Sequence, residues 1–195
     1  MLFIQAQSGI EARKKLIEAM LNEATPSSDA ELLIEAPFVL RIDAPKSVID
    51  WRHDDTALCD VVPASNERDA LVNTLRAHYF ARISQTKIAA VIELLQRNPY
   101  SKKAVLSFWE EGDMLRAAGS ACIMYMWFRR CGENIDCHIH IRASDVYKKL
   151  LANIAIASQV HSEVASSLKL GIGFLFVISD CGHIYKIDKD ATRLA

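Results

Sequence analysis

Hydrophobic and polar positions follow two rhythms along the chain, mainly helical in the first half and strand-like in the second. Apolar residues at helical spacing in the first half predict helices over about 10–24, 66–80 and 86–97, the last capped by Thr86. Looser alternation predicts strands over 1–7 and 32–42, and Pro37 predicts an edge or a bulge in the second of these. The segment 48–63 has no regular pattern and receives no assignment.

In the second half, apolar runs separated by polar turns predict strands over 104–109, 121–129, 135–142 and 173–185. Ser144 is placed to cap a long apolar helix from Asp145 to about Leu168, with Gly171 as its stop. We therefore predict one α+β domain over residues 1–195, with a mixed or mostly antiparallel sheet packed by the long helix.

Composition narrows the range of partners. Hydrophobic residues make up 51% and charged residues 24% of the 195 residues, which is ordinary for a soluble globular protein. A net charge of −1 leaves no global basic field for nucleic acid, whereas a small anion needs only a local cluster of cations. No apolar stretch is long enough for a membrane span, and no basic leader indicates a signal peptide. Five cysteines, an odd number, favour free thiols and a cytoplasmic location.

Cys122 and Arg142 are the first candidates for chemistry. A cysteine in a strand is usually a small buried hydrophobic residue. Arg142, however, ends a strand that we expect to pair with the Cys122 strand through the turn near Gly132. A guanidinium close to a thiol favours the reactive thiolate, and arginine is also a natural partner for phosphate.

Further polar residues extend the candidate site. Asn153 lies inside the apolar helix, so its amide needs partners, either in the backbone or on the edge of a ring such as uracil. His183 and Tyr185 alternate on one face of the last strand, so both could reach a sugar hydroxyl. Lys102 and Lys103 form a second cationic spot, which taken alone is typical of a solvated turn.

A metal site is not expected at Cys137, His138 and His140, although the three residues look superficially like a cluster. Successive strand residues point to opposite faces, so Cys137 cannot easily converge with the two histidines. No second Cys/His cluster has the spacing of zinc ligands.

Read together, five segments resemble the thymidylate synthase and pyrimidine hydroxymethylase superfamily in their order and spacing. These are residues 101–109 (SKKAVLSFW), Cys122, 142–145 (RASD), Asn153 and 180–185 (DCGHIY). The resemblance covers about 86–185. It implies a thymidylate synthase-like α+β fold and a transferase that adds a methyl or hydroxymethyl group at C5 of a pyrimidine nucleotide or nucleoside. It also implies 5,10-methylenetetrahydrofolate as the one-carbon donor.

The resemblance assigns a role to each candidate. It makes Cys122 the nucleophile that adds to C6 of the ring, and Arg142 its cationic neighbour and a phosphate ligand. Asn153 would bind the pyrimidine edge, whereas Asp145 would bridge nucleotide and pterin through hydrogen bonds. His183 and Tyr185 fall where the family binds ribose, and Lys102 with Lys103 where paired arginines reach the partner's phosphate.

A homodimer is expected on two grounds, the resemblance and the strand pattern. Residues 104–106 and 123–128 are apolar on both faces, so one face can cover the long helix while the other needs a partner sheet.

Several positions depart from the family pattern. The family usually has Pro-Cys-His or a close variant at the nucleophile, whereas this chain has Ala121-Cys122-Ile123, and Ala143 replaces a serine. The loop 25–29 lacks a phosphate-binding arginine, and the usual segment that closes over folate is not found after Tyr185. The glutamate that organises proton transfer cannot be assigned; the candidates are Glu35, Asp43, Asp50, Asp54 and Asp55.

Two other functions fit these departures. One is a non-folate pyrimidine nucleotide enzyme that uses the same thiolate for substitution at C5 or for glycosidic cleavage. The other is a catalytically altered subunit that binds a nucleotide for a partner. The retained Cys122 favours an enzyme.

Overall fold

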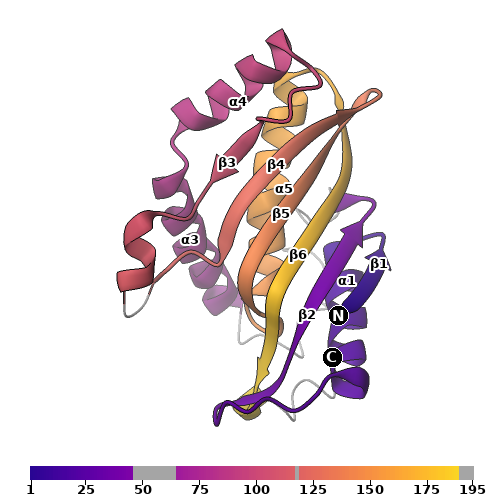
Figure 1. Ribbon diagram of the computed structural model, residues 1–195, viewed down its shortest axis with the longest axis vertical. Coiled ribbons are helices and arrows are strands. Elements are labelled where there is room, and N and C mark those ends of the chain that lie inside the picture. The colour runs from indigo at the N-terminus through magenta and orange to yellow at the C-terminus, as the bar shows by residue number, and fades with distance from the viewer. Residues whose placement is uncertain (46–64, 117–118, 189–195) are drawn as a thin grey trace.

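A six-stranded mixed sheet forms the centre of the molecule, and the computed structural model describes it within residues 1–45, 65–116 and 119–188 (Figure 1). The strand order is β1-β2-β6-β5-β4-β3. Neighbours are parallel in the pairs β1·β2 and β5·β6 and antiparallel in the other three pairs. The strands are β1 (Leu2–Ala6), β2 (Leu32–Ile42), β3 (Val105–Ser107), β4 (Ile123–Cys131), β5 (Asn134–Asp145) and β6 (Gly171–Tyr185). The predicted α+β class with a mixed sheet is confirmed.

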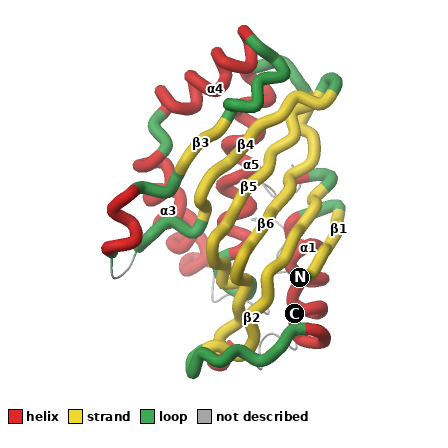
Figure 2. The backbone as a smooth tube through the Cα atoms, in the orientation of Figure 1, coloured by secondary structure: helices red, strands yellow, loops and turns green. Residues whose placement is uncertain are grey.

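Helices pack on one side of this sheet around α5, as Figure 2 shows by colour. The described helices are α1 (Gly9–Glu23), α3 (Ser65–Arg82), α4 (Gln85–Arg97) and α5 (Leu150–Ser167). Helix α5 contacts β4, β5 and β6 as well as the other three helices. Its apolar residues, such as Ile154, Val160 and Val164, are fully buried, so the core lies between α5 and the sheet as the sequence predicts.

The other face of the sheet, which we call the outer face, carries a row of aromatic residues. Trp127 contacts the ring of His138, which in turn contacts Phe174 and Phe176. Tyr125, at 38% exposure, packs edge-on against His140. The central strands are therefore apolar on both faces, as predicted, and the homodimer expected from this pattern stays a prediction.

Three element boundaries differ from prediction, and each has a local cause. Helix α4 is capped by Ser84, whose hydroxyl accepts from the Lys87 N–H, rather than by Thr86. Strand β5 runs on through Ser144 and Asp145, so α5 begins at Leu150 instead of Asp145. The chain turns after α5 at Lys169, whose φ is 57°, and not at Gly171.

Pro37 marks a bulge and not a sheet edge. Strand β2 lies between β1 and β6, and its register with β6 shifts between Ala36 and Phe38. Gly182 faces this bulge and leaves room for the Phe38 ring, because a Cβ there would lie 2.5 Å from it. The predicted irregular segment 48–63 lies outside the described residues.

Two further features of the described residues bear on the earlier expectations. No helix in the described ranges is long and apolar enough to cross a membrane. Cys122, Cys131, Cys137 and Cys181 are all free thiols.

Candidate functional site

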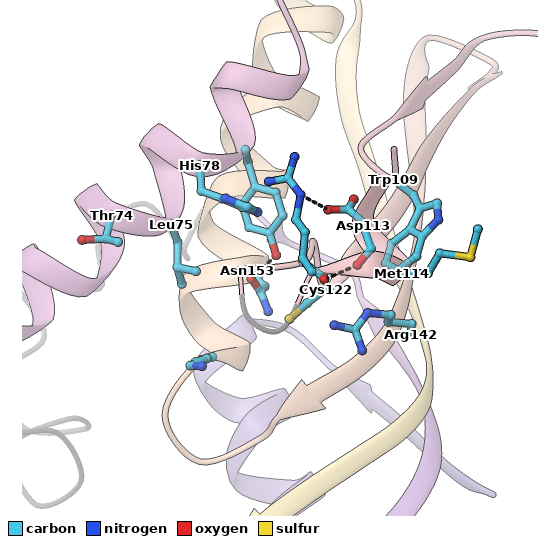
Figure 3. A pocket seen from close by; sticks show the side chains of 14 residues that line it. Thr74, Leu75, His78, Trp109, Asp113, Met114, Cys122, Arg142 and Asn153 are labelled. Carbon is cyan, nitrogen blue, oxygen red and sulfur yellow. Dashed lines mark hydrogen bonds and ion pairs between the residues drawn. The ribbon is translucent and has the colours of Figure 1, made fainter. Parts of the chain in front are cut away.

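A cleft of about 570 Å³ opens between α3, the start of β4, the end of β5 and the first turns of α5. Figure 3 shows Thr74, Leu75 and His78 of α3 on one side and Trp109, Met114 and Arg142 on the other, with Cys122 and Asn153 between them. The remaining lining residues are Tyr79, Asp113, Arg116, Gly119, Ser120 and Lys149.

Cys122 and Arg142 meet in the cleft because their strands pair. The Arg142 N–H donates to the Cys122 carbonyl over 3.0 Å, and Arg142 Nε donates to the Ala121 carbonyl over 3.1 Å. The guanidinium carbon lies 5.6 Å from the centre of the Trp109 ring. The predicted strand pairing is thus confirmed, and a partly exposed thiol shares the cleft with a positioned cation.

Asn153 and Tyr79 form a buried polar pair at the back of the cleft. The Tyr79 hydroxyl donates to Asn153 Oδ1 over 3.1 Å and accepts from the Ile123 N–H over 3.4 Å. Burial, followed by the nearby Cys122 thiol, raises the pKa of Tyr79, so the phenol stays protonated and remains a donor. Asn153 Nδ2 is buried and has no hydrogen-bond partner among the described residues. One N–H donor group at this site is therefore free to bind a ligand.

Arg82 and Asp113 form a second buried pair beside the cleft. We call this pair closed, because both carboxylate oxygens of Asp113 accept hydrogen bonds within the protein. Arg82 donates to both Asp113 carboxylate oxygens, over 2.6 and 2.8 Å, and also to the Phe108 carbonyl over 2.9 Å. The hydrogen bonds from Arg82 hold the pKa of Asp113 far below its usual range. Asp113 lines the cleft as a fixed anion and cannot accept a proton near neutral pH.

Asp145, His183 and Tyr185 gather where β5 and β6 end side by side. Asp145 pairs with His183 in the sheet register, and the rings of His183 and Tyr185 lie 5.2 Å apart. Burial raises the pKa of Asp145, whose Oδ1 accepts from the Lys148 N–H over 2.9 Å. The Lys149 N–H donates to the Asp145 carbonyl, which joins this group to the cleft that Lys149 lines.

The family comparison fits this arrangement. The model of the family described as Thymidylate synthase matches residues 49–194, which is more than half of the chain. The chain belongs to the thymidylate synthase family. Enzymes of this family transfer a one-carbon unit to C5 of a pyrimidine nucleotide, and the match supports that general activity here. All eight predicted site residues, from Lys102 to Tyr185, lie inside the matched range.

Lys102 and Lys103, for which the resemblance predicts a role toward a partner's phosphate, lie apart from the cleft. Both are exposed in the turn that precedes β3, and neither is among the lining residues of the cleft. This placement leaves their predicted role toward a partner's phosphate as a prediction.

None of the carboxylates proposed for proton transfer lines the cleft within the described residues. Glu35 lies on β2, with its carboxylate 4.0 Å from Cys181 Sγ. Asp43 binds Gln5 and Arg41 through hydrogen bonds of 2.8 and 2.7 Å. Asp50, Asp54 and Asp55 lie outside the described part of the chain.

Among the cleft residues that sequence reasoning missed are His78, Tyr79, Arg116 and Lys149. Tyr79 and His78 come from the last turns of helix α3, where an aromatic or histidine normally indicates packing. Lys149 carries a usable signal, since Asn153 follows it by four residues and the two share one helix face.

Metal ligation has no geometric support in the described ranges, where no three His, Cys, Asp or Glu side chains converge on one point. Cys137 is fully buried in the core, whereas His138 packs against Trp127 on the outer face. The strand alternation separates them as expected.

Proposed function

We propose that this protein is a thymidylate synthase-like transferase that adds a methyl or hydroxymethyl group at C5 of a pyrimidine nucleotide or nucleoside. One observation carries the proposal: the thiol of Cys122, the guanidinium of Arg142 and the open amide donor of Asn153 line one cleft. These three groups supply a nucleophile, a cation for an anionic ligand and a hydrogen bond for a ring carbonyl.

In this mechanism the Cys122 thiolate adds to C6 of the pyrimidine. A C6–S bond forms, and the electron pair of the C5=C6 bond moves toward C5 and the C4 carbonyl, which makes C5 nucleophilic. Arg142 binds the phosphate, with Arg116 and Lys149 as further cations on the cleft wall. His183 and Tyr185 would bind the sugar, and Asp145 would bridge the two ligands.

Asn153 is proposed to hold the base through its free Nδ2–H, which would donate to a ring carbonyl. Its Oδ1 accepts from Tyr79 and keeps a second lone pair, which suits the N3–H of uracil. We therefore expect uracil to bind more tightly than cytosine.

The residues beside Arg142 fit a flat cofactor ring, as tetrahydrofolate has. Trp109 offers an indole surface and Met114, at 71% exposure, a flexible apolar side chain on the same cleft. When bound, 5,10-methylenetetrahydrofolate would supply the one-carbon unit. Trp109, Met114 and Asp145 are the residues proposed to hold it.

The homodimer is proposed to form through the outer face of the sheet. Tyr125, Trp127, Phe174 and Phe176 give this face a continuous aromatic surface that no described helix covers. Light scattering at micromolar concentration should give the mass of a dimer, and a monomer would contradict both the dimer and the crossing role of Lys102 and Lys103.

Thiol alkylation tests the proposed function without a known substrate. Iodoacetamide should modify Cys122, and dUMP at saturating concentration should slow that modification at least tenfold. The exposed thiol of Cys131 is a matched internal control, because it lies at the far end of β4 and should react equally with and without nucleotide. Peptide mass spectrometry reports both sites in one sample.

Ligand-dependent unfolding then separates the candidate activities. A ligand at 100 times its dissociation constant should stabilise the protein by roughly 2.7 kcal/mol. We would compare dUMP, UMP, dCMP and CMP, each with and without 5,10-methylenetetrahydrofolate. Binding without turnover would favour the altered subunit, and turnover without folate would favour a non-folate enzyme. Lack of protection of Cys122 by every nucleotide would contradict all three.

A further inference from the structure

His78 is an ionisable side chain of the cleft that the mechanism above leaves unused. It lies on α3, four residues after Thr74, so the two share one face of the helix and both line the cleft. The imidazole is half-buried and packs edge-on against Tyr79, with ring centres 5.4 Å apart. Within the described residues it makes no hydrogen bond or ion pair, so both ring nitrogens are available to a ligand.

Apart from Cys122, the other ionisable residues that the structure describes in the cleft wall cannot exchange protons readily at neutral pH. Asp113 is fixed as an anion by Arg82. Tyr79 holds its proton because burial raises its pKa. Arg116, Arg142 and Lys149 are cations that bind anions. A C5 substitution nevertheless requires that a proton enter or leave the bound ring.

We propose that His78 is the acid–base catalytic residue of this cleft, carrying a proton to and from C5 of the pyrimidine. The proposal rests on the proposed function. After the thiolate of Cys122 adds to C6, the imidazolium gives its proton to C5, and the C5 electron pair forms the new C–H bond. In reverse, the imidazole takes a proton from C5, the pair restores the C5=C6 bond, and the thiolate leaves.

The surroundings of His78 suit a proton acceptor. Burial, followed by the positive charges of Arg82 and Arg116, lowers the pKa of His78, whereas Asp113 and Glu110 act in the opposite direction. The neutral imidazole therefore predominates at neutral pH and can accept a proton. A bound phosphate would favour the imidazolium.

Hydrogen exchange at C5 tests this step without any cofactor. The protein is incubated with dUMP in D2O, and loss of the C5 proton signal is followed by NMR; dCMP is run in parallel. His78→Gln should reduce the exchange rate about 100-fold or more, with the dissociation constant of dUMP changed less than twofold. In His78→Ala, added imidazole should restore exchange in proportion to its concentration.

Two further variants serve as controls. Cys122→Ser should abolish exchange, and Asn73→Ala, an exposed residue of α3 outside the cleft, should leave it unchanged. If His78→Gln exchanges within threefold of wild type while Cys122→Ser is inactive, the role of His78 is wrong and the proposed function stands. Absence of exchange with wild-type protein that binds dUMP would overturn the proton transfer as well as the C6 adduct.

Discussion

Two buried polar pairs border the same cleft and differ in how completely they are satisfied. Arg82 and Asp113 bind each other through two hydrogen bonds, and Asp113 also accepts from the Glu110 N–H. Tyr79 and Asn153 share one hydrogen bond, and Asn153 Nδ2 is left without a partner among the described residues. Both pairs are almost fully buried, so exposure does not distinguish them.

This difference assigns a structural role to the first pair and a ligand-binding role to the second. A buried ion pair whose two carboxylate oxygens both accept hydrogen bonds stabilises one conformation and has little left to offer a ligand. A buried amide with an open donor costs free energy until something accepts from it. We infer that the Arg82–Asp113 pair holds α3 to the β3–β4 connection, and that the Tyr79–Asn153 pair is completed by the ligand.

Breaking the closed pair should have the largest effect on stability. Arg82→Met leaves Asp113 buried with only the half-exposed Arg116, whose Nε lies 3.6 Å from Asp113 Oδ1, as a cation, so we expect the melting temperature to fall by roughly 10 °C. The double variant Arg82→Met/Asp113→Leu should recover most of this loss, because it removes the unpaired charge. Thermal unfolding by circular dichroism measures both, and a shift of under 2 °C in the single variant would contradict a supporting role.

Removing the Tyr79 hydroxyl should have the next largest effect. Tyr79→Phe keeps the ring but leaves the Ile123 N–H and Asn153 Oδ1 without their partner, at a cost of about 1–3 kcal/mol in the free energy of unfolding. Urea unfolding gives this value from the midpoint and slope. Tyr100→Phe is the control, because Tyr100 is 76% exposed and should change stability little.

Changing the open amide should alter the specificity for the base. Asn153→Asp places an acceptor where Nδ2 now donates, so the ratio of dUMP to dCMP affinity should fall at least several-fold. Calorimetry at one pH and salt concentration measures the ratio. An unchanged ratio would mean that Asn153 does not contact the base.

The smallest expected effect lies at the other end of α5 and depends on pH. His161 is fully buried, and burial lowers its pKa, so the unfolded chain takes up a proton before the folded protein does. Stability should therefore fall as the pH drops below about 6.5, by up to about 1.4 kcal/mol for this residue at pH 5.5. His161→Gln should weaken the dependence, and the difference between the two proteins removes the contributions of His78 and His138, whose pKa values are also lowered.

Much of the fold could be predicted from the sequence because the apolar pattern of each long element agrees with its place in the sheet. The start of α5 could not be predicted in this way. Ser144 and Asp145 form a good local cap signal, yet both pair with β6 residues, Gly182 and His183. Pairing in the sheet outweighs the local capping preference of Ser144 and Asp145, so the helix begins at Leu150.

In the candidate site, too, local contacts could be predicted from the sequence and contacts between distant segments could not. The meeting of Cys122 with Arg142 follows from a hairpin, which is local and visible in the sequence. Tyr79 reaches Asn153 from 74 residues away through helix packing, and no spacing rule predicts such a contact. Sequence reasoning therefore brought Cys122 and Arg142 together but missed the residues that α3 contributes. The roles of all these residues, and the single domain over 1–195, stay predictions.

The position of β6 in the sheet sets the order in which the chain can fold. β6 is the last described strand, yet it lies between β2 and β5, where Ile42 pairs with Leu175. On the ribosome, β1, α1 and β2 are made first but must wait for some 140 further residues before their sheet neighbour exists. The hairpin of β4 and β5 can form while β6 is still being made. We expect the N-terminal unit to join last, and until then its apolar strand edge is exposed to other chains.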